Sequence, residues 1–141
     1  MTKENEEVIR RGYEAINRGD VVAMKQLVDA DVELHSRFGA VAGRVYRGHE
    51  GIDRWYADMQ ESFGEVEQLP ERFIEVDAER TIAVVHFRGK GRGSGAEVDQ
   101  RFAVICTVRD GKGVKLETYA SLDEALEVAG LGGGRAGGLQ K

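Results

Sequence analysis

Asp99 and Arg101 are the first candidates for chemistry, because they lie two residues apart in a run of β-forming residues. Side chains two positions apart on a strand point to the same face, so this carboxylate and this guanidinium can pair. A neighbouring arginine keeps the pKa of an aspartate low, which suits stabilisation of charge better than general-base catalysis. The alternative is an ion pair at the surface or at a dimer interface, where such pairs are common and weak.

Histidine and cysteine supply the other reactive side chains. His35 shares one face of an alternating run with Glu33 and Arg37, and an imidazole there is a natural acid or base at neutral pH. The alternative for His35 is a partly exposed strand histidine, whereas His86 shares its face with apolar residues and is expected in a core or an interface. Cys106 lies among apolar residues and is expected to be a buried structural thiol. These side chains have no metal-ligand spacing, so we expect neither a metal nor another cofactor.

Composition narrows the range of partners. The chain has 141 residues, which is enough for one domain with a substantial core. Its net charge of −5 argues against a nucleic acid or an acidic membrane surface as the main partner. No apolar run approaches the roughly 20 residues of a membrane span, and the first residues contain no apolar signal region. We therefore expect a cytoplasmic protein.

The elements that must position these side chains follow from hydrophobic spacing. Apolar residues at helical spacing predict three helices, at 3–17, 22–29 and 49–63. Alternating or β-rich runs predict strands at 31–38, 71–77 and 80–88. Asp110-Gly111 joins two further β-rich runs and predicts a hairpin, because both turn positions favour positive φ. Ser121 and Glu124 form a capping box that opens a last short helix.

Helices come early in this order and hairpin-linked strands come later. That order is typical of the α+β class, with helices packed on one face of an antiparallel sheet. The glycine-rich run 88–95 lacks the Walker pattern and has no helix after it, so it is interpreted as a hairpin loop. We assign one domain to residues 1–131 and expect the glycine-rich tail 132–141 to be disordered.

Three short motifs connect this chain with a known family. Residues 13–20 read Tyr-Glu-Ala-Ile-Asn-Arg-Gly-Asp, residues 47–52 read Arg-Gly-His-Glu-Gly-Ile with Trp55 after them, and residues 108–112 read Val-Arg-Asp-Gly-Lys. In this order, they resemble the end of the first helix, the start of the third helix and the signature hairpin of nuclear-transport-factor-2-like proteins. The resemblance is strongest to the SnoaL-like branch and extends to Leu131.

The resemblance implies a conical, strongly curved antiparallel sheet wrapped around helices on its concave face. It also implies a pocket inside the cone and a homodimer formed through the convex face of the sheet. The residues implied for the ligand pocket are Tyr13, Phe38, Trp55, Tyr56, Met59 and Ile105. Tyr119 ends the last strand near that pocket, so it joins His35, Asp99 and Arg101 as a candidate catalytic residue.

Function is not determined by this resemblance, because the family includes isomerases, cyclases, dehydratases, epoxide hydrolases and non-enzymatic modules. The positions that match the catalytic residues of the steroid isomerases are Gly12, Ser36 and Ile105, which excludes that mechanism. We expect a pocket for a small hydrophobic molecule, with acid/base catalysis (cyclase, dehydratase, isomerase or epoxide-hydrolase-like) that needs no cofactor. The alternative is a non-enzymatic ligand-binding or dimeric protein-interaction module. In that module, dimerisation or a protein partner would use the apolar face of Phe102, Val104, Cys106 and Val108.

Overall fold

The computed structural model describes residues 2–36 and 43–131. The predicted pocket residue Phe38 and the predicted tail 132–141 lie outside the described residues. The first half of the chain contains α1 (Thr2–Asn17), α2 (Val21–Gln26), β1 (Val28–His35), β2 (Val45–Arg47) and α3 (Gly48–Ser62). The second half contains β3 (Phe63–Glu75), β4 (Arg80–Gly91), β5 (Glu97–Arg109), β6 (Lys112–Tyr119) and α4 (Leu122–Val128).

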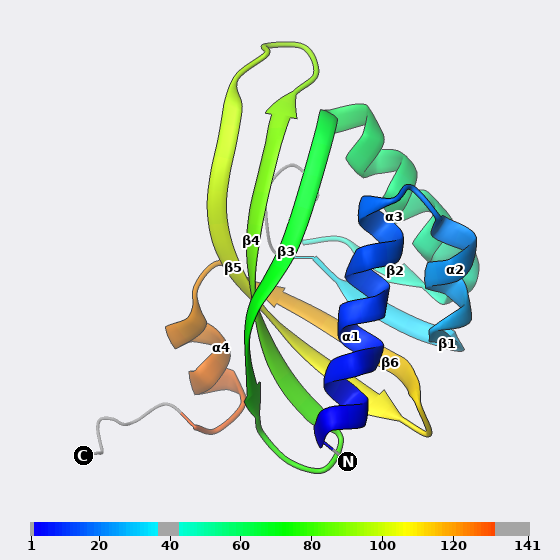
Figure 1. Cartoon of the computed structure of the whole chain (residues 1–141), viewed down its shortest axis with the longest axis vertical. Coiled ribbons are helices and arrows are strands. Elements are labelled where there is room, and N and C mark those ends of the chain that lie inside the picture. The colour runs from blue at the N-terminus through cyan, green and yellow to red at the C-terminus, as the bar shows by residue number, and fades with distance from the viewer. Residues whose placement is uncertain (1, 37–42, 132–141) are drawn as a thin grey trace.

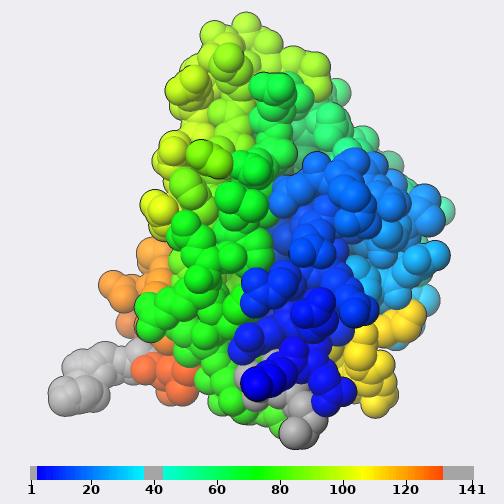
Figure 2. All heavy atoms as spheres, viewed as in Figure 1, coloured from blue at the N-terminus to red at the C-terminus, as the bar shows by residue number. Residues whose placement is uncertain are grey.

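The strands form one curved, open sheet in the order β2-β1-β6-β5-β4-β3 (Figure 1). Neighbouring strands are antiparallel except for β1 and β6, which pair in parallel. Helices α1, α2 and α3 lie on the concave side of this sheet (Figure 1). Figure 2 shows the atoms of α1 directly against those of β3. The predicted α+β class with a curved sheet around helices is therefore confirmed.

The Asp110-Gly111 turn has the backbone geometry that its sequence predicts. Asp110 has a φ of 53° and Gly111 has a φ of 76°, and the flanking residues Arg109 and Lys112 are register partners of β5 and β6. A positive φ at both central positions matches the right-handed twist of the two strands. This hairpin fixes the register of the two strands that form the middle of the sheet.

The motif at residues 13–20 ends α1 and attaches it to the sheet. The Asn17 side chain donates to the carbonyl oxygen of Gln68 at 2.8 Å and accepts from the backbone N–H of Gln68 at 2.9 Å. Gly19 then takes a φ of 76°, and the Asp20 side chain accepts a hydrogen bond from the N–H of Ala23 at the start of α2. Asn17 thus pairs with the edge strand β3 as a neighbouring strand would.

The motif at residues 47–52 brings α3 close to β2. Gly48 has a φ of 70°. A Cβ atom on Gly51 would lie 2.8 Å from the carbonyl carbon of Tyr46, so only glycine allows this approach. The approach buries Ile52 and Trp55 in the core. No helix among the described residues is both long enough and apolar enough to span a membrane.

The two faces of β5 have different neighbours. Phe102, Val104, Cys106 and Val108 face the concave side and pack in a buried cluster with Ile9 of α1. This apolar face is therefore not available for a partner, which corrects the alternative that assigned it to dimerisation or a protein contact.

Helix α4 is an exception to the predicted arrangement of helices on the concave face. Its Ala125 packs against Ile82, Ala103 and Ile105, which point to the outer side of the sheet. The outer face of the central strands is therefore partly covered within the chain.

Candidate functional site

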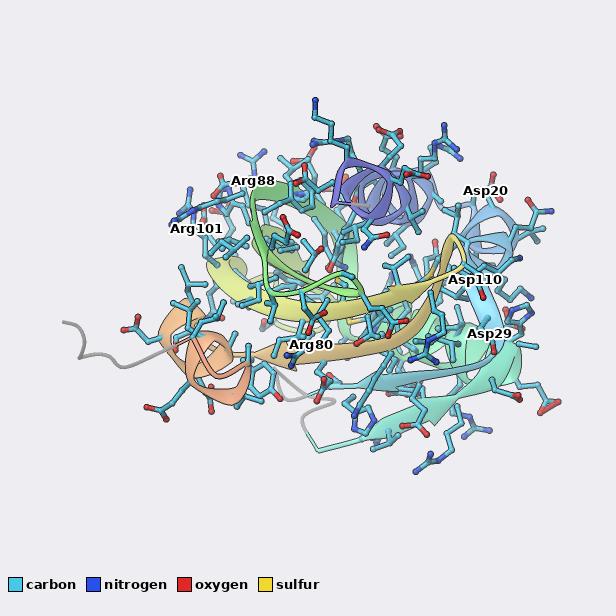
Figure 3. The ribbon with its side chains drawn as sticks, turned by 90° about the horizontal axis from the view of Figure 1, so that it is seen from below. Asp20, Asp29, Arg80, Arg88, Arg101 and Asp110 are labelled. Carbon is cyan, nitrogen blue, oxygen red and sulfur yellow. The ribbon has the colours of Figure 1, made fainter. Side chains whose placement is uncertain are left out.

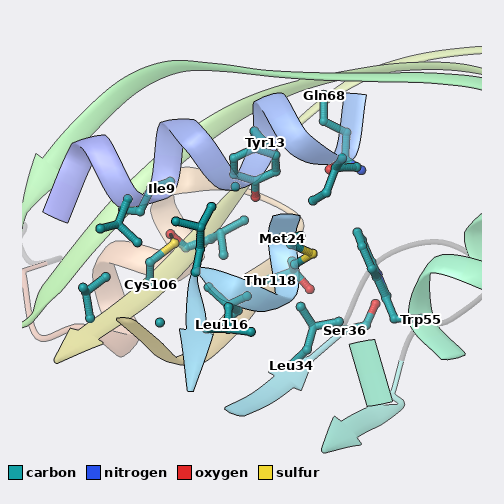
Figure 4. A pocket seen from close by; sticks show the side chains of 18 of the residues that line it. Ile9, Tyr13, Met24, Leu34, Ser36, Trp55, Gln68, Cys106, Leu116 and Thr118 are labelled. Atoms are coloured by element: carbon teal, nitrogen blue, oxygen red, sulfur yellow. Dashed lines mark hydrogen bonds between the residues drawn. The ribbon is translucent and has the colours of Figure 1, made fainter. Parts of the chain in front are cut away.

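A cavity of about 90 Å³ lies between the concave face of the sheet and helices α1, α2 and α3 (Figure 4). Its wall is mainly aliphatic and aromatic, with Tyr13 from α1, Met24 from α2 and Trp55 and Met59 from α3. No described residue of this wall carries a carboxylate, an imidazole, an ammonium or a guanidinium group. Ligand pockets usually measure about 300–1,000 Å³, and a cavity of about 150 Å³ holds benzene. This cavity is smaller than both, so it suits a molecule of only a few heavy atoms.

Besides the Tyr13 hydroxyl, the side chains of Ser36, Gln68 and Thr118 interrupt the apolar wall. Ser36 follows β1 and Thr118 lies in β6, and the two strands place them side by side because His35 and Glu117 are register partners. The Thr118 hydroxyl donates to the carbonyl oxygen of His35 at 3.0 Å. Ser36 is 5% exposed and Gln68 is 3% exposed. Within the described part of the chain, neither the Ser36 hydroxyl nor the Gln68 amide forms a hydrogen bond.

Tyr13 brings a phenol to the cavity, and its side chain points inward from α1 (Figure 4). Burial raises the pKa of Tyr13 well above its ordinary value, and the nearby Cys106 thiol raises it further. Burial also raises the pKa of the Cys106 thiol to about 12. Both groups are therefore neutral near pH 7, so Tyr13 is a hydrogen-bond donor there and neither group is a base.

Gly12 leaves part of the cavity empty. It lines the cavity from α1, and a Cβ atom at this position would meet no atom within 4 Å. A larger side chain at Gly12 would therefore occupy the cavity without a backbone clash.

The candidate catalytic residues of β5 lie on the outer face of the sheet. Asp99 contacts His86 across the strands at 2.6 Å, and Arg101 donates to Glu71 at 2.7 and 3.2 Å. Asp99 and Arg101 thus share a face, as predicted, but each pairs with another residue. The hydrogen bond with His86 is the largest cause that lowers the pKa of Asp99. Figure 3 shows Arg101 at the periphery of the molecule, and neither residue lines the cavity.

The other two candidate catalytic residues also lie off the cavity wall. His35 forms a 2.9 Å contact with Glu33, and the Tyr119 hydroxyl donates to Glu117 at 3.3 Å. The hydrogen bond with His35 is the largest cause that lowers the pKa of Glu33. The structure thus brings none of the four predicted catalytic side chains to this cavity.

Among the predicted pocket residues, Tyr13, Trp55 and Met59 line the cavity. Tyr56 instead packs against the neighbouring core cluster, and Ile105 faces α4 on the outer side of the sheet. Among the described residues, no group of three or more histidine, cysteine, aspartate or glutamate side chains is arranged to hold a metal ion.

Sequence reasoning did not assign Ser36, Gln68 and Thr118 to the site. A signal was present for two of them: Ser36 continues the apolar face of Val32 and Leu34, and Thr118 has the same parity as Leu116. A single polar residue on an otherwise apolar strand face is the feature that could have indicated the cavity.

The sequence model of the SnoaL-like domain matches residues 9–116. The chain belongs to the SnoaL-like domain family. No curated protein sequence matches this SnoaL-like domain.

Solved structures with the same fold include an NTF2-like protein of unknown function from Burkholderia pseudomallei. It is 20% identical with a TM-score of 0.74, and the match covers 89% of this chain and 97% of that one. TerC, co-crystallised with polyporic acid, is 23% identical with a TM-score of 0.73, and the match covers 90% and 98% of the two chains. A putative SnoaL-like polyketide cyclase from a Jannaschia species is 16% identical with a TM-score of 0.72, and the match covers 94% of each chain. At sequence identities this low, the structural similarity establishes the fold alone.

Proposed function

We propose that this SnoaL-like domain binds a small, uncharged and mainly hydrophobic molecule in the cavity between α1 and the concave face of the sheet. The observation that carries this proposal is the composition of the wall. Apolar side chains form most of it, and a few buried polar groups without charge interrupt it. Small-molecule sites in proteins have this composition.

The lack of charge on the described wall favours a neutral ligand. Transfer of a carboxylate or an ammonium ion out of water is costly unless an opposite charge compensates it. The described wall offers no such charge. A neutral molecule meets no comparable penalty and gains free energy from the apolar surface that it buries.

Binding is favoured over acid/base catalysis at this cavity. A general acid or base works best when its pKa is close to the working pH. The two titratable groups on the described wall, Tyr13 and Cys106, both have pKa values raised by burial. Catalysis by His35, Asp99, Arg101 or Tyr119 stays a prediction from the sequence. Polyporic acid in TerC supports the use of this fold for small organic ligands.

Methionine methyl groups provide the test, because the chain has three methionines and two of them, Met24 and Met59, line the cavity. The protein is labelled with ¹³C at the methionine methyls and titrated with isobutene and, separately, with acetate, which has the same number of heavy atoms but carries a charge. We expect isobutene to shift the Met24 and Met59 signals in a saturable way and acetate to leave them unchanged. Gly12→Leu, which places a side chain in the cavity, is expected to abolish the isobutene response.

Two results would contradict the proposal. If isobutene leaves both signals unchanged up to its solubility limit, the cavity does not take up apolar molecules. If acetate shifts them as strongly as isobutene does, the cavity does not select for neutral ligands.

The homodimer through the outer sheet face is also a proposal, based on the family resemblance. Sedimentation of the 15.5 kDa chain tests it, with one species of twice that mass expected and a monomer at micromolar concentration contradicting it. On the outer face, β3 to β5 carry the cross-strand pairs Glu67–Arg88 and Glu71–Arg101, so a partner surface there would meet paired charges.

A further inference from the structure

Gly12 lies in the middle of the α1 face that lines the cavity. Val8, Ile9, Tyr13 and Ile16 of the same helix also line it. Residues four positions apart on a helix share a face, so position 12 shares its face with Val8 and Ile16. Figure 4 shows Ile9 and Tyr13 on the cavity side of α1, one on each side of Gly12 in the sequence. A side chain at position 12 would therefore extend the wall between them.

The usual structural reasons for a glycine do not apply to Gly12. Unlike Gly19 and Gly48, Gly12 does not have a positive φ. A Cβ atom on Gly12 would meet no atom within 4 Å, whereas a Cβ atom on Gly51 would lie 2.8 Å from the Tyr46 carbonyl carbon. Alanine would thus fit at position 12 without backbone strain and without a clash.

Glycine at this position also has a cost in stability. Gly12 lies in the interior of α1, a helix of 16 residues. In the interior of a helix, glycine is less favourable than alanine by an amount that changes the folding equilibrium constant about fivefold. The chain thus has a residue here that the helix disfavours and that the packing does not require. What glycine provides at this position is empty space on the cavity wall.

We propose that Gly12 determines the size of the molecule that the cavity accepts, and that an apolar branch of the ligand packs against the α1 backbone at Gly12. This inference rests on the proposed function, because it assigns the size limit of the same cavity. The cavity measures about 90 Å³, so one additional methyl group on its wall removes a substantial share of its volume. A methyl group on the wall and a methyl group on the ligand then compete for the same space.

Two alkenes that differ by one methyl group test the inference. Isobutene carries one methyl group more than propene, and both are uncharged. Each is titrated into the protein labelled with ¹³C at the methionine methyls, and its dissociation constant is measured from the Met24 and Met59 signals. The variant is Gly12→Ala. Gly64→Ala is the matched control, because Gly64 does not line the cavity and a Cβ atom there also meets no atom within 4 Å.

In the wild type we expect isobutene to bind about fourfold more tightly than propene, because its additional methyl group buries more apolar surface. Gly12→Ala should weaken isobutene about twentyfold, the effect of overpacking by one methyl group, and propene by less than about twofold, so the preference reverses. In urea unfolding without ligand, Gly12→Ala should raise the folding equilibrium constant about fivefold. Gly64→Ala should leave both dissociation constants unchanged.

Three results would overturn the inference while the proposed function stands, provided that the wild type binds isobutene. If Gly12→Ala lowers the stability, glycine has a structural role in α1. If Gly12→Ala leaves both dissociation constants unchanged, the ligand does not use the space at Gly12. If it weakens both alkenes equally, Gly12 does not select by size. If the wild type binds neither alkene, the proposed function fails together with the inference.

Discussion

Asn17→Ala should destabilise the fold more than its exposed position suggests. The substitution removes both hydrogen bonds to Gln68, at 2.8 and 2.9 Å. The backbone N–H and carbonyl of Gln68 then lose their partners in a residue that is only 3% exposed. Each buried backbone group without a partner costs about 1–3 kcal/mol. Because water can reach the Asn17 side, we expect the lower half of that range for each group, about 2–4 kcal/mol in total.

Urea unfolding followed by the fluorescence of the single tryptophan measures this loss. Trp55 is 8% exposed in the folded chain, so its emission reports its transfer to water. Arg18→Ala is the matched control. Arg18 is the next residue, is exposed and forms only a 3.6 Å surface ion pair with Asp20, which is worth less than about 1 kcal/mol.

A second substitution separates the two hydrogen bonds. Asn17→Asp keeps the acceptor for the Gln68 N–H but places a carboxylate oxygen against the Gln68 carbonyl oxygen. We expect it to destabilise the fold as well, and more strongly at pH 7 than at a pH where the aspartate is protonated. If Asn17→Ala costs no more than Arg18→Ala, the attachment of α1 to β3 through Asn17 does not stabilise the fold, and the reasoning is refuted.

Three further substitutions or reactions test other parts of the structure. Gly51→Ala should lower the free energy of unfolding by about 1–3 kcal/mol, because its Cβ would lie 2.8 Å from the Tyr46 carbonyl carbon; an unchanged urea midpoint would contradict this packing. Thr81→Val should raise that free energy by about 1 kcal/mol, because the Thr81 hydroxyl is buried without a partner among the described residues; a loss of stability would show that the hydroxyl is bonded. Cys106, with a pKa of about 12, should react with a disulfide reagent at pH 8 about three orders of magnitude more slowly in the folded chain than in urea. Equal rates in the two states would refute its burial.

Much of the fold can be predicted from the sequence because its signals are local. The Asp110-Gly111 turn requires two positive φ angles, and the Ser121 capping box needs only the next turn of helix; the structure contains both. The first part of β3, from Phe63, was missed because it is an edge strand with glycine and charged residues in place of an apolar alternation. Its backbone pairs with β4 and with the Asn17 side chain, and neither contact is visible in a local pattern.

The candidate site was harder to predict, because it depends on the direction in which the sheet curves. The alternation in β5 correctly separates Phe102 and Val104 from Asp99 and Arg101, but it does not say which set faces the hollow side. Candidate catalytic residues come from the polar set, and in this structure that set lies on the outer face of the sheet. The apolar set surrounds the cavity instead.

Because the cavity lies on the apolar side of the sheet, the polar residues on that side say more about ligand binding than the charged residues on the outer face. On the solvent-facing surface of the sheet, Asp99 pairs with His86 and Arg101 pairs with Glu71. Neither side chain needs a ligand as a partner, so their presence says little about binding.

On the cavity side, Ser36 and Gln68 are polar side chains on an apolar wall, and they form no side-chain hydrogen bond with the described residues. Buried polar groups are normally hydrogen-bonded, so a molecule in the cavity, a water or a ligand, is where their partners lie. That is the physical reason to look for a ligand on the apolar side of the sheet rather than at the charged residues of the outer face.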